Sequence, residues 1–291
     1  HTRLRTVTGV QTCALPISMS GVYTIDAAGG NYLSFGAAVS DLISHGINGP
    51  VTFNVAPDIY NEQVTIPAIN GINASNTVSF VKASGSVLVS SAGTSGTSDG
   101  VIVLNGADYI TFDGINVLDA GSSASNYAEY GYYLTNGASR NRIKNTVVTL
   151  KKANTNSVGI KLFNNGTAAT SNNYNQIYNF TIQNCYNGIQ IIGSSSGADT
   201  SNEIGVASTG LNLIMDIGKT TSSLPVYGIQ TTNQHAAKIF NTEITDTRAA
   251  GTATQATGIS YSGTVTSTRG KIYGNKIQDR KSTRLNSSHR T

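Results

Sequence analysis

The sequence has no tryptophan, two methionines and five prolines among its 291 residues, and only 12% of the residues are charged. So few charges exclude a coiled coil, which needs long runs rich in Glu, Lys and Leu. No apolar run approaches the ~18–20 residues that a membrane-spanning helix needs. The 38% share of hydrophobic residues, set in short regular runs, argues against disorder. What remains is a chain rich in Gly, Asn, Ser and Thr that can bury a core.

The two ends of the chain are related at the level of nucleotides. Residues 7–17 can be encoded by a string of eleven codons whose reverse complement encodes residues 279–289. One oligonucleotide, read in both directions, therefore explains both ends, and the string resembles a short-read sequencing adapter. We expect residues 1–18 and 279–291 to be non-native segments and exclude them from the fold. The genuine part, 19–278, is then expected to be a fragment that stops within a repeat, with further domains of the full-length chain outside it.

Excluding the ends changes what the charge and the cysteines imply. The whole chain has 19 basic and 15 acidic residues. The ends hold six of the basic residues and one acidic residue, which leaves 13 against 14 and a net charge of −1. That balance does not indicate a nucleic-acid partner. The ends also contain Cys13, so Cys185 stands alone and is expected to be a small buried apolar residue.

The first element expected is a short helix over residues 33–45, with Ser34 as its N-cap and Gly46 just after its end. Its apolar residues recur at helical spacing on one face: Phe35, Ala38, Val39, Leu42 and Ile43. Short β-rich runs follow, separated by Gly, Asn, Ser and Asp. These runs are Val51–Val55, Gln63–Ile66, Thr77–Val81, Val87–Val89, Gly100–Leu104, Tyr109–Phe112 and Ile115–Leu118.

From about residue 130 the runs become a repeat. Five segments begin with Gly and an apolar or aromatic residue, at Gly131, Gly159, Gly188, Gly228 and Gly258, with offsets of 28, 29, 40 and 30 residues. Four units also contain two β-branched residues five apart with an Asn between: Ile143–Val148, Ile177–Ile182, Ile239–Ile244 and Ile272–Ile277. The remaining unit departs from the pattern and predicts an insertion over 193–227.

A fixed period of short strands without helices predicts a solenoid, in which stacked turns bury a continuous core. The Ile and Val residues would point inward in columns. Asn suits the tight corners because it tolerates a positive φ and can bond to its own backbone. Asn stacked on Asn in successive turns would form a side-chain ladder.

The opening of the chain resembles that of secreted bacterial β-helix proteins, in which a helix caps the first coil. The matching pieces are Tyr23–Ile25, the helix, Val51–Val55 and Tyr60–Ile66, and the segment Leu104–Gly114 is also typical of that group. Over 19–278 the chain thus resembles the right-handed parallel β-helix (pectin-lyase-like) superfamily. This implies an all-β, single-stranded parallel β-helix with a short N-terminal capping α-helix, truncated at its C-terminal end, in a secreted or cell-surface protein. The superfamily contains lyases, hydrolases, esterases and non-enzymatic surface proteins, so the resemblance does not choose an activity.

The densest acidic stretch holds Asp108, Asp113 and Asp119. Glycoside hydrolysis needs two carboxylates that face each other about 5–9.5 Å apart. Asp108 and Asp113 are the candidate catalytic pair, and the alternative is that both bond to backbone amides in turns. The Gly-His-Gly and Gly-x-x-Asp-Phe-Ile-Phe-Gly motifs of the superfamily's pectin-degrading enzymes are absent. No Cys/His spacing indicates a metal, and no cofactor is expected.

Two outward columns of the predicted coils carry functional candidates. The residues that follow the inward Ile at the Asn corners are Lys144, Tyr178, Phe240 and Tyr273. Tyr178, Phe240 and Tyr273 are candidate carbohydrate-binding residues, because an outward aromatic column can stack sugar rings. The alternative is that a loop covers these rings or that they stack on one another. The second column is polar and is expected to be a solvated face: Tyr133, Lys161, Gln190, Gln230 and Ser260.

The sequence therefore supports two functions. The first is a non-catalytic β-helix module of a secreted or cell-surface bacterial protein, a stalk or adhesin-like surface with polysaccharide as its partner. The alternative is a polysaccharide lyase or glycoside hydrolase of the same superfamily. Its site would lie in the insertion 193–227 or in a part of the chain beyond residue 278.

Overall fold

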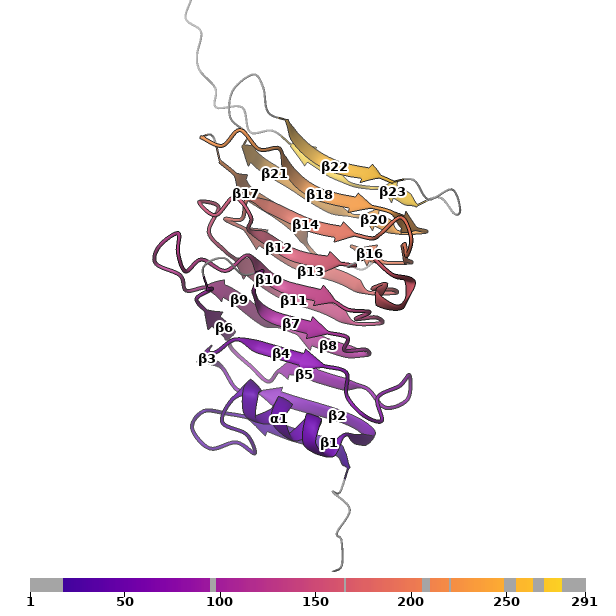
Figure 1. Cartoon of the computed structure of the whole chain (residues 1–291). Helices are drawn as coiled ribbons and strands as arrows, with labels where there is room; N and C mark the ends of the chain where they lie inside the picture. The colour runs from indigo at the N-terminus through magenta and orange to yellow at the C-terminus, as the bar shows by residue number, and fades with distance from the viewer. Residues whose placement is uncertain are drawn as a thin grey trace, which may run out of the picture.

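The computed structural model describes residues 18–94, 98–164, 166–205, 210–219, 221–248, 255–263 and 270–278. The segments assigned to an adapter lie outside these ranges except for Ser18. The described chain winds into stacked coils of short strands, with the helix α1 at one end of the stack (Figure 1). Neighbouring strands of successive coils pair in parallel. The solenoid expected from the repeat is confirmed, and its fold class is a right-handed parallel β-helix.

The strands form three strips that run along the stack. The first strip consists of β1 (Met19–Ile25), β2 (Ile47–Val55), β5 (Val78–Lys82), β8 (Ile110–Asp113), the first halves of β11 (Arg142–Thr149) and β13 (Gln176–Gln183), β16 (Glu203–Ile204), β20 (Lys238–Phe240) and β23 (Lys271–Tyr273). The second strip consists of β3 (Asp58–Asn61), β6 (Val87–Ser91), β9 (Ile115–Asp119), the second halves of β11 and β13, β17 (Asn212–Gly218), β21 (Thr242–Arg248) and β24 (Lys276–Gln278).

The third strip is a separate sheet of seven strands. It consists of β4 (Val64–Pro67), β7 (Gly100–Asn105), β10 (Tyr130–Thr135), β12 (Val158–Phe163), β14 (Asn187–Ile192), β18 (Val226–Thr232) and β22 (Ala256–Ser262). Between the third strip and the first lie the 3-10 turn η1 (Ala168–Thr170) and the short pair β15 (Asp199–Thr200) and β19 (Gln234–His235). The predicted strand runs thus recur as β2 and β4 to β9, with ends shifted by a few residues.

Helix α1 (Phe35–His45) lies across the first coils, two residues shorter at its start than the sequence predicts. Ser34 caps it as expected by accepting a backbone N–H at 3.1 Å. The Glu62 carboxylate, from the turn between β3 and β4, accepts two further N–H groups at 2.8 Å each, where the helix dipole favours a negative charge. The buried face is Phe35, Ala38, Val39 and Leu42. Ile43 was expected on that face and is instead 48% exposed. The buried face of the helix is therefore narrower than the spacing of the apolar residues suggests.

The interior is filled by stacked columns of like side chains. In the first coils the rings of Phe53, Phe80 and Phe112 stack at centroid distances of 5.0 and 5.1 Å. Further along, Ile143 pairs in register with Ile177, and both are buried as the repeat predicts. Each coil therefore buries apolar side chains against the coils on either side, as a solenoid requires.

The glycines that begin the repeat units stand in one column at the start of the third strip. A Cβ built on Gly188 would lie 2.4 Å from the carbonyl oxygen of Gly228 and 2.7 Å from Cγ2 of Ile214. The same crowding meets Gly131, Gly159 and Gly228. Glycine recurs here because the third strip passes too close to the second for any side chain to fit.

The corner between the first and second strips carries the predicted asparagine ladder. Asn145, Asn179 and Asn241 have φ values of 56°, 53° and 51°, in the left-handed region that Asn tolerates. The Asn179 side chain donates to that of Asn145 at 3.1 Å, and Asn145 donates to Asp113 at 2.6 Å. The tight turns and the ladder expected from the sequence are thus confirmed at these positions.

A second ladder, which the sequence analysis missed, is buried at the corner between the third and first strips. Asn141, Asn175 and Asn202 are each 1% exposed. The side chain of Asn175 accepts the N–H of Asn141 at 3.0 Å and donates to the carbonyl of Ala138 at 2.9 Å. Asn202 accepts the N–H of Asn175 in the same way. Backbone groups that the corner would leave unpaired are thereby satisfied coil by coil.

The segment 193–227 supplies β15, β16 and β17. The strands β16 and β17 pair in register with the coils on either side, and β15 pairs with β19 of the following coil. Its extra length lies in the connections between strands. Cys185, just before it, is fully buried, and burial raises the pKa of its thiol to about 12. The expectation that Cys185 is a buried apolar residue is confirmed.

Candidate functional site

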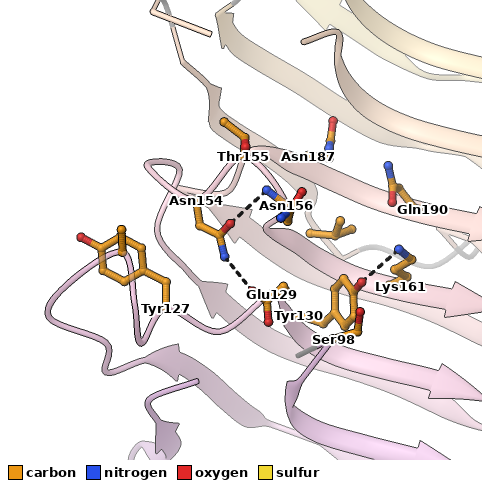
Figure 2. A pocket seen from close by; sticks show the side chains of 12 residues that line it. Ser98, Tyr127, Glu129, Tyr130, Asn154, Thr155, Asn156, Lys161, Asn187 and Gln190 are labelled. Carbon is orange, nitrogen blue, oxygen red and sulfur yellow. Dashed lines mark hydrogen bonds between the residues drawn. The ribbon is translucent and has the colours of Figure 1, made fainter. Parts of the chain in front are cut away.

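A polar hollow of about 580 Å³ opens on the outer face of the third strip (Figure 2). We call it the Glu129 pocket. Its lining residues are Ser98, Ala124, Tyr127, Glu129, Tyr130, Asn154, Thr155, Asn156, Val158, Lys161, Asn187 and Gln190. They come from strands β10, β12 and β14 and from the connections that lead from the second strip to the third. The stacking of coils therefore brings together residues that lie about one coil apart in the sequence.

Glu129 lines this pocket, and Asp99 lies against it to form an acidic pair. Glu129 and Asp99 each precede a strand of the third strip, and the main-chain N–H of each donates to the carboxylate of the other, at 3.3 and 3.4 Å. Asp99 also accepts the N–H of Thr94 at 2.5 Å. Burial, followed by the hydrogen bond and repulsion between the carboxyl groups, raises the pKa of Glu129 to about 7. Glu129 can therefore hold or release a proton near neutral pH.

A lysine and a tyrosine lie beside the acidic pair on the floor of the pocket. The Lys161 ammonium donates to the Tyr130 hydroxyl at 3.2 Å and lies 4.6 Å from the centre of the Tyr130 ring. Figure 2 shows Tyr130 next to Glu129, with Lys161 reaching the hydroxyl from the following coil. Because Lys161 supplies the hydrogen to this bond, the hydroxyl of Tyr130 keeps its own proton for another acceptor.

Amide side chains complete the pocket. Asn154 contacts Glu129 at 3.4 Å through its Nδ2 and holds the N–H of Asn156 at 3.0 Å with its oxygen. Gln190 donates to Gln230 of the next coil at 2.9 Å. Amides and phenol groups of this kind match the hydroxyl groups of a sugar. The arrangement offers an acid–base group, a cation and hydrogen-bonding partners within one hollow.

The fold is a right-handed parallel β-helix. A search of solved structures gives matches of the same architecture. A pectin methylesterase from Aspergillus niger is 13% identical with a TM-score of 0.49, covering 90% of this chain and 87% of that chain. A pectin methylesterase from Erwinia chrysanthemi is 11% identical with a TM-score of 0.44, covering 89% and 90%. An alginate lyase from a Paenibacillus species is 10% identical with a TM-score of 0.33, covering 82% and 97%.

No protein-family model matches the sequence, and no curated protein sequence matches it. At these identities the structural matches concern the course of the chain, and no residue role is carried over from them. Over the part of the chain that the structure describes, no helix is long and apolar enough to cross a membrane. Within those same ranges, no group of three or more His, Cys, Asp or Glu side chains is placed to hold a metal ion.

Asp108 and Asp113 lie on either side of the strand β8. Asp108 stands before the corner at Tyr109, where φ is 54°, and Asp113 is the last residue of the strand. Asp108 accepts the N–H of Ser139 at 2.8 Å, and burial raises its pKa. Asp113 forms an ion pair with Lys144 at 2.7 Å. Each carboxylate thus binds a residue of the neighbouring coil.

The predicted aromatic column is aligned but interrupted. Tyr178 and Phe240 occupy equivalent places in the first strip, and in the coil between them Gly205 follows the strand β16. The rings of Phe240 and Tyr273 stack with centroids 5.0 Å apart and planes 3° apart. Phe240 is 4% exposed, whereas Tyr273 is 50% exposed. Tyr273 therefore offers the accessible ring of this pair.

The polar column on the third strip is aligned as expected, from Tyr133 through Lys161 and Gln190 to Gln230. The interpretation of it as a plain solvated face is wrong in one stretch, because Lys161 and Gln190 form the floor of the Glu129 pocket. The acidic pair was missed as well. Asp99 and Glu129 are 30 residues apart, which is the length of one coil. Each comes directly before a strand of the third strip, β7 and β10. That offset was the signal in the sequence.

Proposed function

We propose that the chain cleaves an acidic polysaccharide by elimination in the Glu129 pocket. The observation that carries this proposal is the acid–base pair of Glu129 and Asp99 beside Lys161 and Tyr130. A group with a pKa near the working pH is best suited to transfer protons. The carboxylate of a uronate in the polysaccharide would pair with the Lys161 ammonium. The hydroxyl groups of the sugar would form hydrogen bonds with Asn154, Asn187 and Gln190.

The elimination would proceed in one round of proton transfers. Glu129, as carboxylate, takes the proton from the carbon next to the uronate carboxyl, whose negative charge Lys161 balances. The bond from the neighbouring carbon to the glycosidic oxygen breaks, and its electrons pass to that oxygen. Tyr130 gives its hydroxyl proton to the leaving oxygen. A carbon–carbon double bond remains in the new non-reducing end, and Tyr130 regains its proton from Glu129 or from water.

Hydrolysis fits this pocket less well. A glycosidase uses two carboxyl groups on opposite sides of the bond, about 5–9.5 Å apart. Glu129 and Asp99 instead share a hydrogen bond between their carboxyl groups, so they do not face each other across a glycosidic bond.

The second candidate is the non-catalytic module expected from the sequence. It is favoured by the stacked Phe240–Tyr273 rings, with Tyr178 further along the same column. In that case Tyr178 and Tyr273 would bind a polysaccharide along the first strip, with the buried Phe240 ring stacked against Tyr273, and the chain would serve as a rigid stalk or adhesin-like surface. For either candidate we propose a secreted or cell-surface location, because such polysaccharides occur outside the cell.

The test is an assay of the full chain against polygalacturonate, alginate and a neutral glucan, following the absorbance of unsaturated products. We expect turnover of one acidic substrate, rising with pH through about 7 as Glu129 loses its proton. Glu129→Gln and Lys161→Met should each lower the rate by at least about 100-fold, as removal of an acid–base group does.

The matched control is Glu243→Gln, because Glu243 is an acid outside the pocket that pairs with Lys276 at 3.2 Å. It should leave the rate unchanged. Binding without any turnover, lost on Tyr273→Ala and kept in Glu129→Gln, would support the non-catalytic module instead.

A further inference from the structure

We propose a second binding site, for the anionic group of an acidic glycan, in a hollow on the first strip. We call it the Arg140 hollow. It has a volume of about 460 Å³, and its main lining residues are Tyr109, Thr111, Arg140, Arg142, Tyr174 and Gln176. These residues do not belong to the Glu129 pocket, so the proposal stands whether or not that pocket is catalytic.

The centre of the hollow is an arginine held between two tyrosines. The guanidinium carbon of Arg140 lies 5.5 Å from the centre of the Tyr109 ring and 5.0 Å from that of Tyr174. The three residues occupy the same corner position in three successive coils. The N–H groups of a guanidinium lie in its plane. Rings that cover its two faces hold the group in place and leave these N–H groups at its edge to bind a carboxylate or sulfate.

The charge of the hollow is unbalanced. Of the three arginines in the described ranges, two line it, and the third, Arg248, pairs with Asp246 at 3.1 Å. Arg142 uses its Nε to donate to Gln176 at 3.0 Å. Among the described residues, no carboxylate lies within ion-pair distance of Arg140 or Arg142.

Two acids lie near the hollow. Asp108 accepts the N–H of Ser139 at 2.8 Å, and burial raises its pKa against the smaller, lowering effect of the Arg140 guanidinium. Glu203, next along the strip after Gln176, accepts a hydrogen bond from the Gln176 amide at 3.0 Å and pairs with Lys238 at 2.6 Å. Neither acid forms an ion pair with Arg140 or Arg142, and the lining of the hollow holds two arginines and no carboxylate.

The backbone at this corner aligns the three side chains. Tyr109, Arg140 and Tyr174 have φ values of 54°, 59° and 58°, in the left-handed region. The following coils place Ser201 and Ala236 in the same conformation at the same corner, with φ values of 56° and 53°. The conformation therefore belongs to the corner itself, and it sets Arg140 between the two tyrosine rings.

The surroundings favour a glycan over a polyphosphate chain. The outward column that includes Arg142 continues through Thr111 to Ser79 on one side and Gln176 on the other. These hydroxyl and amide groups are neutral and suit sugar hydroxyls. A nucleic acid would need a longer positive track to neutralise successive phosphates.

The test is affinity electrophoresis or calorimetry of the full chain with polygalacturonate, chondroitin sulfate, dextran and a single-stranded DNA oligonucleotide. We expect binding to at least one of the acidic glycans, weakened between 50 and 300 mM salt, and none to dextran. The two acidic glycans separate carboxylate from sulfate recognition. Arg140→Asn and Arg142→Gln should each weaken binding about 10-fold or more, as loss of a charge-assisted hydrogen bond does.

Arg140→Asn also protects the test against a folding defect, because Asn tolerates the positive φ, and its melting temperature should not fall. Arg248→Gln is the matched control for the loss of one positive charge and should keep full affinity. Failure to bind any acidic glycan, preferential binding of the DNA, or unchanged affinity of both arginine variants would each overturn the proposal. Loss of binding in Glu129→Gln alone would assign all binding to the Glu129 pocket and would also overturn it.

Discussion

Replacing Asp199 by Asn is expected to stabilise the protein at neutral pH and to destabilise it in acid. Asp199 is fully buried at the corner between the third and first strips. Its neighbours are amides and no cation: the N–H of Asn172 at 2.9 Å, Asn164 at 3.4 Å and Gln234 at 3.3 Å. Burial outweighs these hydrogen bonds and raises the pKa of Asp199 from 3.8 to about 6.

The sign and size of the effect follow from this pKa. The folded protein keeps the Asp199 proton up to about pH 6, whereas the unfolded chain releases it near pH 3.8. The stability contributed by the proton is therefore full below pH 3.8 and is lost as the pH rises through 6. At 1.36 kcal/mol per pH unit this gap corresponds to about 3 kcal/mol. The Asn variant avoids that loss but gives up one hydrogen bond to Gln234, about 1 kcal/mol.

The net expectation is a variant about 2 kcal/mol more stable than the wild type above pH 7 and about 1 kcal/mol less stable below pH 4. The two curves should cross near pH 4.5. Urea unfolding followed by circular dichroism between pH 3.5 and 8 measures this, with Glu243→Gln as a surface control. A difference between Asp199→Asn and wild type that does not change with pH would refute the reasoning, because it would show that Asp199 is ionised at no cost.

Three further outcomes are expected. Gly188→Ala should lower the free energy of unfolding by about 2–3 kcal/mol, because its Cβ meets Gly228 and Ile214; an unchanged value in urea unfolding would contradict the crowding. Asn175→Ala should cost about 3 kcal/mol by leaving two buried backbone groups unpaired, whereas Asn145→Gly, at a corner with φ of 56°, should cost under about 1 kcal/mol. Cys185 should react with a thiol reagent only after denaturation, since it is 0% exposed; rapid labelling of the native protein would disprove its burial.

The repeat could be predicted from the sequence because successive coils require the same residue at the same position. Gly131 and Gly159 mark a position without room for a side chain, and Asn145 and Asn179 mark a turn with positive φ. The buried ladder of Asn141 and its equivalents escaped notice, because nothing in a single sequence distinguishes an asparagine that bonds the interior backbone from one that faces water.

The candidate site was harder to predict for a different reason. Glu129 and Asp99 meet only because one coil length separates them, and the repeat was recognised from about residue 130 onward, after both positions. Lys161 was placed correctly on the outer face, but the walls that turn that face into a pocket come from irregular connections such as 151–157. Their path is set by packing and not by the period of the strands.

The alignment of hydrogen bonds along the stack has a mechanical consequence. Bonds between parallel strands run across the strands, so in this fold they point along the axis of the coil. A pull on the two ends would load the bonds between neighbouring coils directly, and the rod would lengthen by releasing whole coils from its ends. The units of 28 to 30 residues correspond to steps of roughly 100 Å of extended chain, and the unit of 40 residues gives a longer step. Under tension the molecule would therefore lengthen in discrete steps, one coil at a time.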